Sequence, residues 1–90
     1  MNKNVIKELR NNIDKVDDQI FDLILERFDY VEKIGNIKKE MNIPVNDKAR
    51  EEIIIERLSE KLSTKINYKE IKKIIGLIIS ISKDIQRRKK

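Results

Sequence analysis

The chain lacks the side chains on which most enzymes rely. It contains no cysteine and no histidine. These absences exclude disulfide frameworks, thiolate metal sites, Ser-His-Asp hydrolases, Cys-His proteases and most zinc enzymes. We therefore expect neither a cofactor nor a metal ion, and any chemistry must come from charge and shape.

Long hydrophobic runs are also missing. No stretch approaches the length of a membrane span, and the first residues lack the apolar core of a signal peptide. The absence of cysteine favours a reducing compartment. We therefore expect a cytoplasmic protein without membrane contact. Its length of 90 residues predicts one domain that spans 1–90.

Charge is abundant, and the net charge of +5 is compatible with nucleic acid or with an anionic small molecule as the partner. Acidic residues are interleaved nearly everywhere, and only residues 87–90 form a purely basic run. Cations at that position complement the dipole of a helix C-terminus. The chain has only two Phe, two Tyr and no Trp, so it offers no stacking platform for single strands. We predict no nucleic-acid partner.

Apolar periodicity predicts an all-α fold. Pro44 cannot continue a helix and restricts the residue before it, so a first helix should end by Met41. Asn46 and Asp47 are both suitable N-caps for a second helix. The predicted helices span about residues 4–41, 48–62 and 68–87, with a short connection at 63–67.

The first predicted helix carries an apolar stripe with one charged member, Arg27. Its spacing alternates between four and three residues, which is typical of a helix-helix seam: Leu9, Ile13, Val16, Ile20, Leu23, Arg27, Tyr30, Ile34, Ile37 and Met41. A guanidinium keeps its proton, and burying it without an anion would cost several kcal/mol. On this residue alone, an ion pair with a neighbouring helix or an extended stem that reaches solvent is the simplest interpretation.

The length of the first helix predicts an oligomer. A helix of ~38 residues would be ~57 Å long. A compact domain of this size has a radius of gyration of only ~12 Å. Much of the stripe would then be exposed in a three-helix monomer. We predict an entwined homodimer in which a second copy covers the stripe.

Two further cations on the first helix can join a site. Lys38 lies eleven residues after Arg27, so it points within ~20° of the same direction and ~16 Å further along. Arg10 lies seventeen residues before Arg27, which places it ~25 Å away and roughly 100° around the helix. In an antiparallel dimer, Arg10 of one subunit would complete the pocket of the other.

Polar residues also interrupt the predicted apolar faces of the second and third helices. They are Asp47, Glu51, Ser82 and Gln86. Each has a modest explanation: Glu51 can pair with Lys38, Ser82 can bond to its own helix, and Gln86 can be exposed at a fraying end. Together they predict a polar pocket inside a bundle. Fixed cations, a carboxylate, a hydroxyl and an amide suit a small polyanion in which charge moves during reaction.

The order and spacing of these residues, over nearly the whole chain, resemble the all-helical class of chorismate mutase. The matching motifs are Leu9-Arg10, Ile13-Asp14-Lys15-Val16-Asp17, Glu26-Arg27, Ile34-Gly35-Asn36-Ile37-Lys38, Pro44-Val45-Asn46-Asp47, Arg50-Glu51, and Ser82 with Gln86. The resemblance implies an intertwined three-helix homodimer with two shared sites. It also implies the conversion of chorismate to prephenate, a Claisen rearrangement on the route to phenylalanine and tyrosine. A pericyclic reaction needs neither proton transfer nor a covalent intermediate, which suits a chain without His or Cys.

By the same resemblance, four residues would bind the substrate carboxylates and the ether oxygen. Arg10 from the partner and Arg27 would hold its two carboxylates. Lys38 and Gln86 would donate to the ether oxygen, where negative charge grows as the carbon-oxygen bond breaks. A ligand carboxylate would then be the anion that Arg27 requires.

The resemblance assigns supporting roles to the remaining candidates. Glu51 would accept a hydrogen bond from the ring hydroxyl, and we therefore group it with the catalytic residues. Asp47 and Ser82 would line the site, and Arg50 would support it. Isochorismate-pyruvate lyase shares this fold and ranks second, because the cluster of Asp47, Arg50 and Glu51 after Pro44 matches the mutase pattern. A regulatory dimer that binds ligand without turnover is a further alternative. The sequence leaves open whether the chain acts alone or is one part of a fusion.

Overall fold

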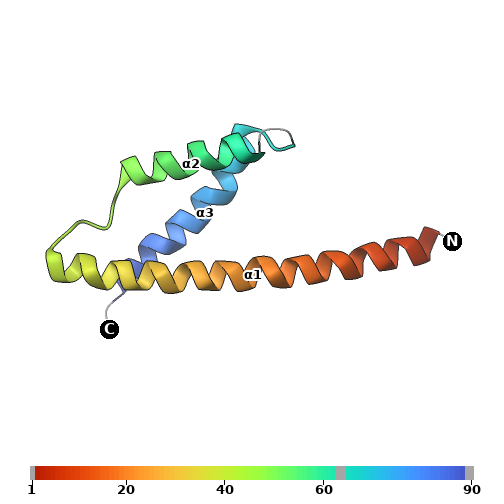
Figure 1. Ribbon diagram of the computed structural model, residues 1–90, viewed down its shortest axis with the longest axis horizontal. Helices are drawn as coiled ribbons and strands as arrows, with labels where there is room; N and C mark the ends of the chain where they lie inside the picture. The colour runs from red at the N-terminus through yellow and green to blue at the C-terminus, as the bar shows by residue number, and fades with distance from the viewer. Residues whose placement is uncertain (1, 63–64, 89–90) are drawn as a thin grey trace. The chain divides into compact units, whose positions relative to one another are not determined.

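The computed structural model describes residues 2–62 and 65–88. In this part of the chain there are three α-helices and no strand: α1 (Asn2–Met41), α2 (Lys48–Leu62) and α3 (Tyr68–Arg87) (Figure 1). The all-α prediction is confirmed, and the predicted bounds hold except that α1 begins at Asn2 rather than Asn4. Residues 63–64 of the predicted connection and 89–90 of the basic tail lie outside the described residues.

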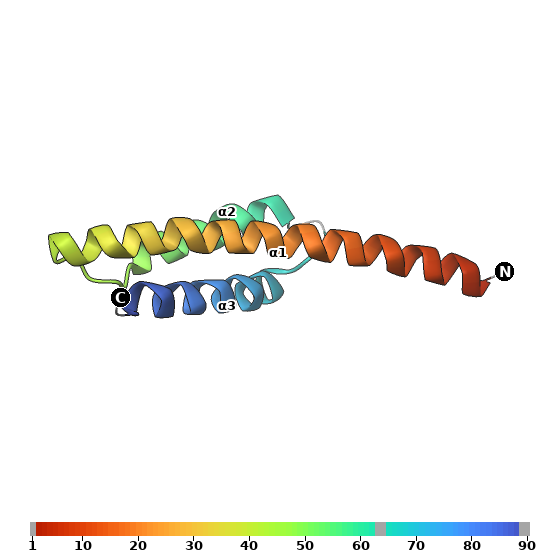
Figure 2. The ribbon, with the colours of Figure 1, turned by 90° about the horizontal axis from the view of Figure 1, so that it is seen from below.

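The chain divides into two compact units, Met1–Tyr30 and Val31–Lys90. Helix α1 contributes residues to both units, whereas α2 and α3 belong to the second. Within the second unit, the C-terminal end of α3 lies beside the last turns of α1, as the two views in Figures 1 and 2 agree. That a single domain spans 1–90 stays a prediction.

The end of α1 is set by Asn42. Its φ of 57° is the left-handed conformation that asparagine tolerates better than most residues. Asn42 N–H donates to Lys39 O (3.4 Å) and Ile43 N–H donates to Lys38 O (2.8 Å). This pattern is a Schellman cap, and Pro44 follows directly. The last carbonyls of α1 are thereby satisfied, and the chain turns away next to Lys38.

Side-chain caps start the other two helices. Asp47 Oδ1 accepts a hydrogen bond from Arg50 N–H at 3.0 Å, which makes Asp47 the N-cap of α2. Asn67 and Glu70 form a capping box at α3, where Asn67 Oδ1 accepts from Glu70 N–H (2.9 Å) and Glu70 Oε1 accepts from Asn67 N–H (3.2 Å). Both starts are therefore encoded locally.

The buried apolar side chains of the described residues all lie in the second unit. They are Val31 from α1, Ile54 from α2, and Ile71 and Ile79 from α3. The predicted inner face of α3 is confirmed, because its members are all buried or half-buried: Ile71, Ile75, Ile78, Ser82 and Ile85. On α2 the predicted stripe is half-buried at Ile55 and Leu58, but the fully buried residue is the neighbouring Ile54. The α2 face is therefore turned slightly from the predicted one.

The apolar stripe of α1 is exposed within this chain. Its hydrophobic members are between 45% exposed at Ile20 and 65% exposed at Met41. The buried residues of α1 are instead Val31 and Gly35, which lie roughly 80° around the helix from the mean direction of the stripe. Packing within the chain therefore uses a different face of α1 and leaves the stripe uncovered.

Candidate active site

The predicted site residues are divided between the two units. Arg10 and Arg27 lie in Met1–Tyr30, and the others lie in Val31–Lys90: Lys38, Asp47, Arg50, Glu51, Ser82 and Gln86. In the second unit these residues occupy the end of α1, the following turn, the start of α2 and the end of α3. Direct contacts join these segments to one another, and they are described in turn below.

Lys38 is half-buried in the last turns of α1 and reaches the turn that follows. Its Nζ donates to Val45 O at 3.3 Å. The main chain of Lys38 is held as well, because its carbonyl accepts the Schellman hydrogen bond from Ile43. The alternative in which Glu51 pairs with Lys38 does not hold, since Glu51 pairs with Lys83. The Lys38 ammonium is bound to one neutral carbonyl, which a stronger anionic acceptor can displace.

Gln86 lies close against Gly35 of α1. A Cβ added to Gly35 would lie 3.0 Å from both Gln86 Cα and Gln86 Cγ, so a larger residue at position 35 would require Gln86 to shift by a few tenths of an ångström. Gln86 Oε1 is buried and has no hydrogen-bond partner in the described part of the chain. A buried amide oxygen without a partner is costly, and such groups are uncommon in native structures, where a catalytic role is one of their known causes. Rotation of the amide places its NH₂ donors at the same point.

Glu51 in the first turn of α2 forms an ion pair with Lys83 of α3. The Glu51 Oε2 to Lys83 Nζ distance is 2.9 Å, and both side chains are only about a quarter exposed. Within the described residues, Glu51 Oε2 has no hydrogen-bond partner of suitable geometry. Its contact with Lys83 is therefore an ion pair rather than a hydrogen bond. Lys83 was not predicted from the sequence. The available signal was its position on α3, directly after Ser82 and one turn before Gln86.

Ser82 and Asp47 both bind main-chain atoms of their own helices. Ser82 is buried, and its Oγ donates to Ile78 O at 2.7 Å, as the modest explanation of this residue predicted. Asp47 is exposed and caps α2 through Arg50 N–H, while the Arg50 side chain is exposed. These residues therefore shape the local backbone that carries Glu51 and Gln86.

Two contacts tie the C-terminal end of α3 to its surroundings. Lys39 Nζ donates to Arg88 O, and Arg87 Nη2 donates to Asn46 Oδ1 at 3.2 Å. Because Lys39 follows Lys38 and Arg87 follows Gln86, each predicted donor to the ether oxygen has an anchored neighbour. The alternative in which Gln86 is exposed at a fraying end does not hold, since Gln86 is half-buried and α3 continues through Arg87.

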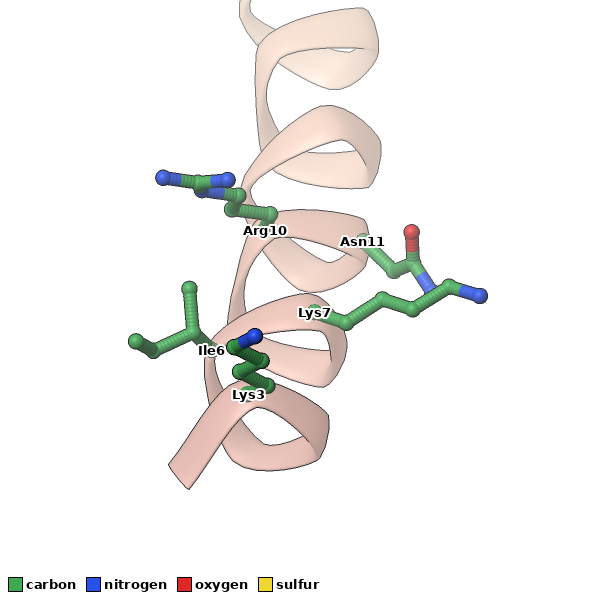
Figure 3. A pocket seen from close by; sticks show the side chains of 5 residues that line it. All are labelled: Lys3, Ile6, Lys7, Arg10 and Asn11. Carbon is green, nitrogen blue, oxygen red and sulfur yellow. The ribbon is translucent and has the colours of Figure 1, made fainter. Parts of the chain in front are cut away.

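Arg10 and Arg27 differ in environment. Arg27 is half-buried, whereas Arg10 is exposed. Arg10 borders an open hollow on one helix, together with Lys3, Ile6, Lys7 and Asn11. Figure 3 shows the Arg10 side chain on one side of the helix and those of Lys7 and Asn11 on the other. The cations of this hollow do not converge, so it does not form a binding site by itself.

In residues 2–62 and 65–88 there is no group of three or more Asp, Glu, His or Cys side chains that could hold a metal ion. No helix in the same ranges is long and apolar enough to cross a membrane.

The fold and these contacts define a class: an all-α protein in which polar side chains lie where the end of α1, the start of α2 and the end of α3 contact one another. The chain belongs to the chorismate mutase type II family, whose family model matches residues 9–87. The matched range includes every predicted site residue. The resemblance noted from the sequence is thereby confirmed.

Curated relatives agree with this family. The chain is 34% identical to a chorismate mutase from Methanocaldococcus jannaschii over 85 residues, which cover 92% of this chain and 85% of the relative. It is 40% identical to a bifunctional chorismate mutase/prephenate dehydratase from Aquifex aeolicus over 53 residues, which cover 59% of this chain and 15% of that protein. No solved structure shows significant similarity to the chain.

Proposed function

We propose that this chorismate mutase family member converts chorismate to prephenate on the route to phenylalanine and tyrosine. The observation that carries the proposal is the family match over residues 9–87, a range that spans every residue proposed here to act on the substrate. Gln86 Oε1 is buried and has no hydrogen-bond partner within residues 2–62 and 65–88, which supports a ligand that hydrogen-bonds to this amide.

The reaction breaks one carbon-oxygen bond while a carbon-carbon bond forms, so no nucleophile or general base is needed. Negative charge grows on the ether oxygen in the transition state. Lys38 and Gln86 would donate to that oxygen, and donors fixed before the reaction cost no reorganisation as the charge develops. Their anchored neighbours, Lys39 and Arg87, favour such preorganisation.

Substrate binding would use the remaining charged residues. Arg27 and Arg10 of the partner subunit would each hold one substrate carboxylate, because a guanidinium matches a carboxylate in two-point geometry. Glu51 would accept the ring hydroxyl. Asp47, Arg50 and Ser82 would support these groups through the first turn of α2 and the last turns of α3.

The role of Arg10 requires a homodimer. The exposed stripe on α1 supports this assembly, since its apolar members remain 45% to 65% exposed in the single chain. A self-complementary seam between two such stripes would remove this surface from water. A cytoplasmic location, without nucleic-acid or membrane partners, stays a prediction.

A direct assay tests the proposed function. The purified protein is incubated with chorismate, the loss of substrate absorbance is followed, and the product is identified by chromatography. We expect the parent protein to form prephenate. We expect Arg27→Ala to lower kcat/KM at least ~100-fold, because the substrate carboxylate that Arg27 holds would lose its counter-ion. A folded dimeric parent that forms no prephenate would contradict the proposal.

A further inference from the structure

Neither the periodicity nor the family resemblance pointed to Lys83, which forms an ion pair with a predicted site residue. It lies on α3 between Ser82 and Gln86, and its Nζ is 2.9 Å from Glu51 Oε2. Lys83 is 26% exposed and Glu51 is 25% exposed, so this ion pair is better shielded from water than an ordinary surface pair. Surface pairs often contribute nothing measurable, whereas breaking a shielded pair leaves an uncompensated charge.

The geometry of the pair matters for the second carboxylate oxygen. An ionised carboxylate has two oxygens and accepts only. Lys83 lies against Oε2, which leaves Oε1 to accept from another donor. A lysine ammonium is a point charge without a rigid fork, so it can fix one oxygen without covering the other. The pair therefore both holds Glu51 in place and keeps one of its oxygens available.

We propose that Lys83 is a positioning residue, which holds Glu51 so that Oε1 accepts the ring hydroxyl of the substrate. Lys83 thereby sets the preference of the enzyme for a substrate with a free hydroxyl. This inference rests on the proposed function, because it takes Glu51 as the hydroxyl acceptor. It adds a residue that connects α3, which carries Gln86, to the first turn of α2.

Three variants separate this role from its competitors. Lys83→Met keeps most of the side-chain length and removes the charge, whereas Lys83→Arg keeps the charge. Lys73→Met makes the same chemical change at an exposed position of the same helix. Each variant is assayed with chorismate and with a chorismate analogue whose ring hydroxyl is methylated. The analogue keeps both carboxylates but cannot donate a hydrogen bond to Glu51.

We expect Lys83→Met to lower kcat/KM for chorismate about tenfold, chiefly through KM, since the hydroxyl contact exists in both the ground state and the transition state. Its kcat/KM for the methylated analogue should change by less than about twofold, so the preference for the free hydroxyl falls about tenfold. Lys83→Arg should retain the preference to within about threefold, and Lys73→Met should match the parent. In a Glu51→Gln background, Lys83→Met should add nothing further to this loss.

Other outcomes would overturn the inference. An equal loss of kcat/KM with both substrates would mean that Lys83 binds a substrate carboxylate or acts on the substrate only through its positive charge. An unchanged preference would reduce the pair to a structural contact, and circular dichroism of each variant excludes unfolding as the cause. Absence of prephenate from the parent would overturn the proposed function and this role together. Prephenate formation with an unchanged preference in Lys83→Met would overturn the role of Lys83 alone.

Discussion

At the residue scale, Gly35 explains how an amide on α3 reaches the end of α1. Glycine inside a helix is less favourable than alanine by ~1 kcal/mol, so a buried helical glycine needs a packing reason. Here the reason is Gln86, whose Cα would be 3.0 Å from a Cβ at position 35. The close approach places Gln86 one turn from Lys38 along α1, which is the pair proposed to stabilise the ether oxygen.

Replacing Gly35 with alanine should therefore disturb catalysis more than folding. The added methyl group must push α3 away by a few tenths of an ångström, and small misplacements of a catalytic group lower rates steeply. We expect Gly35→Ala to lower kcat at least ~10-fold and the free energy of unfolding by ~1–2 kcal/mol. The matched control is Gly76→Ala, because a Cβ there meets nothing within 4 Å. It should keep the parental kcat and gain ~0.5–1 kcal/mol in the free energy of unfolding.

Steady-state kinetics measure kcat, and urea unfolding measures the free energy of unfolding. A parental kcat in Gly35→Ala would contradict the role of Gly35 in positioning Gln86.

The sequence predicted individual site residues where polarity conflicts with its surroundings. Arg27, Glu51 and Ser82 stand out because each interrupts an apolar pattern. Lys83 does not, since a lysine in a chain with 21 basic residues carries no signal of its own. Its importance depends on the approach of α3 to α2, which local sequence does not encode.

At the element scale, helix bounds were predictable because local side chains set them. Asn42 and Pro44 end α1, and Asp47 starts α2. The face that α1 uses within the chain was not predictable from periodicity, since the exposed stripe is the stronger pattern. The weaker face includes Val31 and Gly35, which are the buried residues of α1, and Gly35 packs against Gln86 of α3.

The cap of α2 gives a prediction at this scale. Asp47→Ala removes the acceptor of Arg50 N–H, and the free energy of unfolding should fall by ~1 kcal/mol. Because Glu51 lies in the same first turn, kcat/KM for chorismate should fall as well, by about threefold. Asp47→Asn keeps a good N-cap and should restore stability to within ~0.3 kcal/mol. Chemical denaturation with parallel kinetics tests this, and equal stabilities of the alanine and asparagine variants would exclude the capping role.

At the scale of the whole molecule, the described chain buries few apolar side chains and leaves many of them exposed. The buried apolar residues of the described ranges are Val31, Ile54, Ile71 and Ile79, whereas the apolar members of the α1 stripe stay exposed. A small core of this kind rarely supplies enough stability alone. Assembly through the stripe would add the missing burial, and it would bring Arg10 of the partner subunit to the site. Stability and activity would then both depend on protein concentration.

The measurement that tests the shared-site chorismate mutase most directly is complementation between two inactive variants. Arg10→Ala and Arg27→Ala are refolded separately and as an equal mixture, and prephenate formation is assayed. If Arg10 acts across the dimer, a mixed dimer has one intact site, built from Arg27 of one subunit and Arg10 of the other. Random pairing makes half of the dimers mixed, so we predict recovery of about a quarter of the parental activity. A mixture as inactive as its two components would contradict the shared site and the dimer on which it depends.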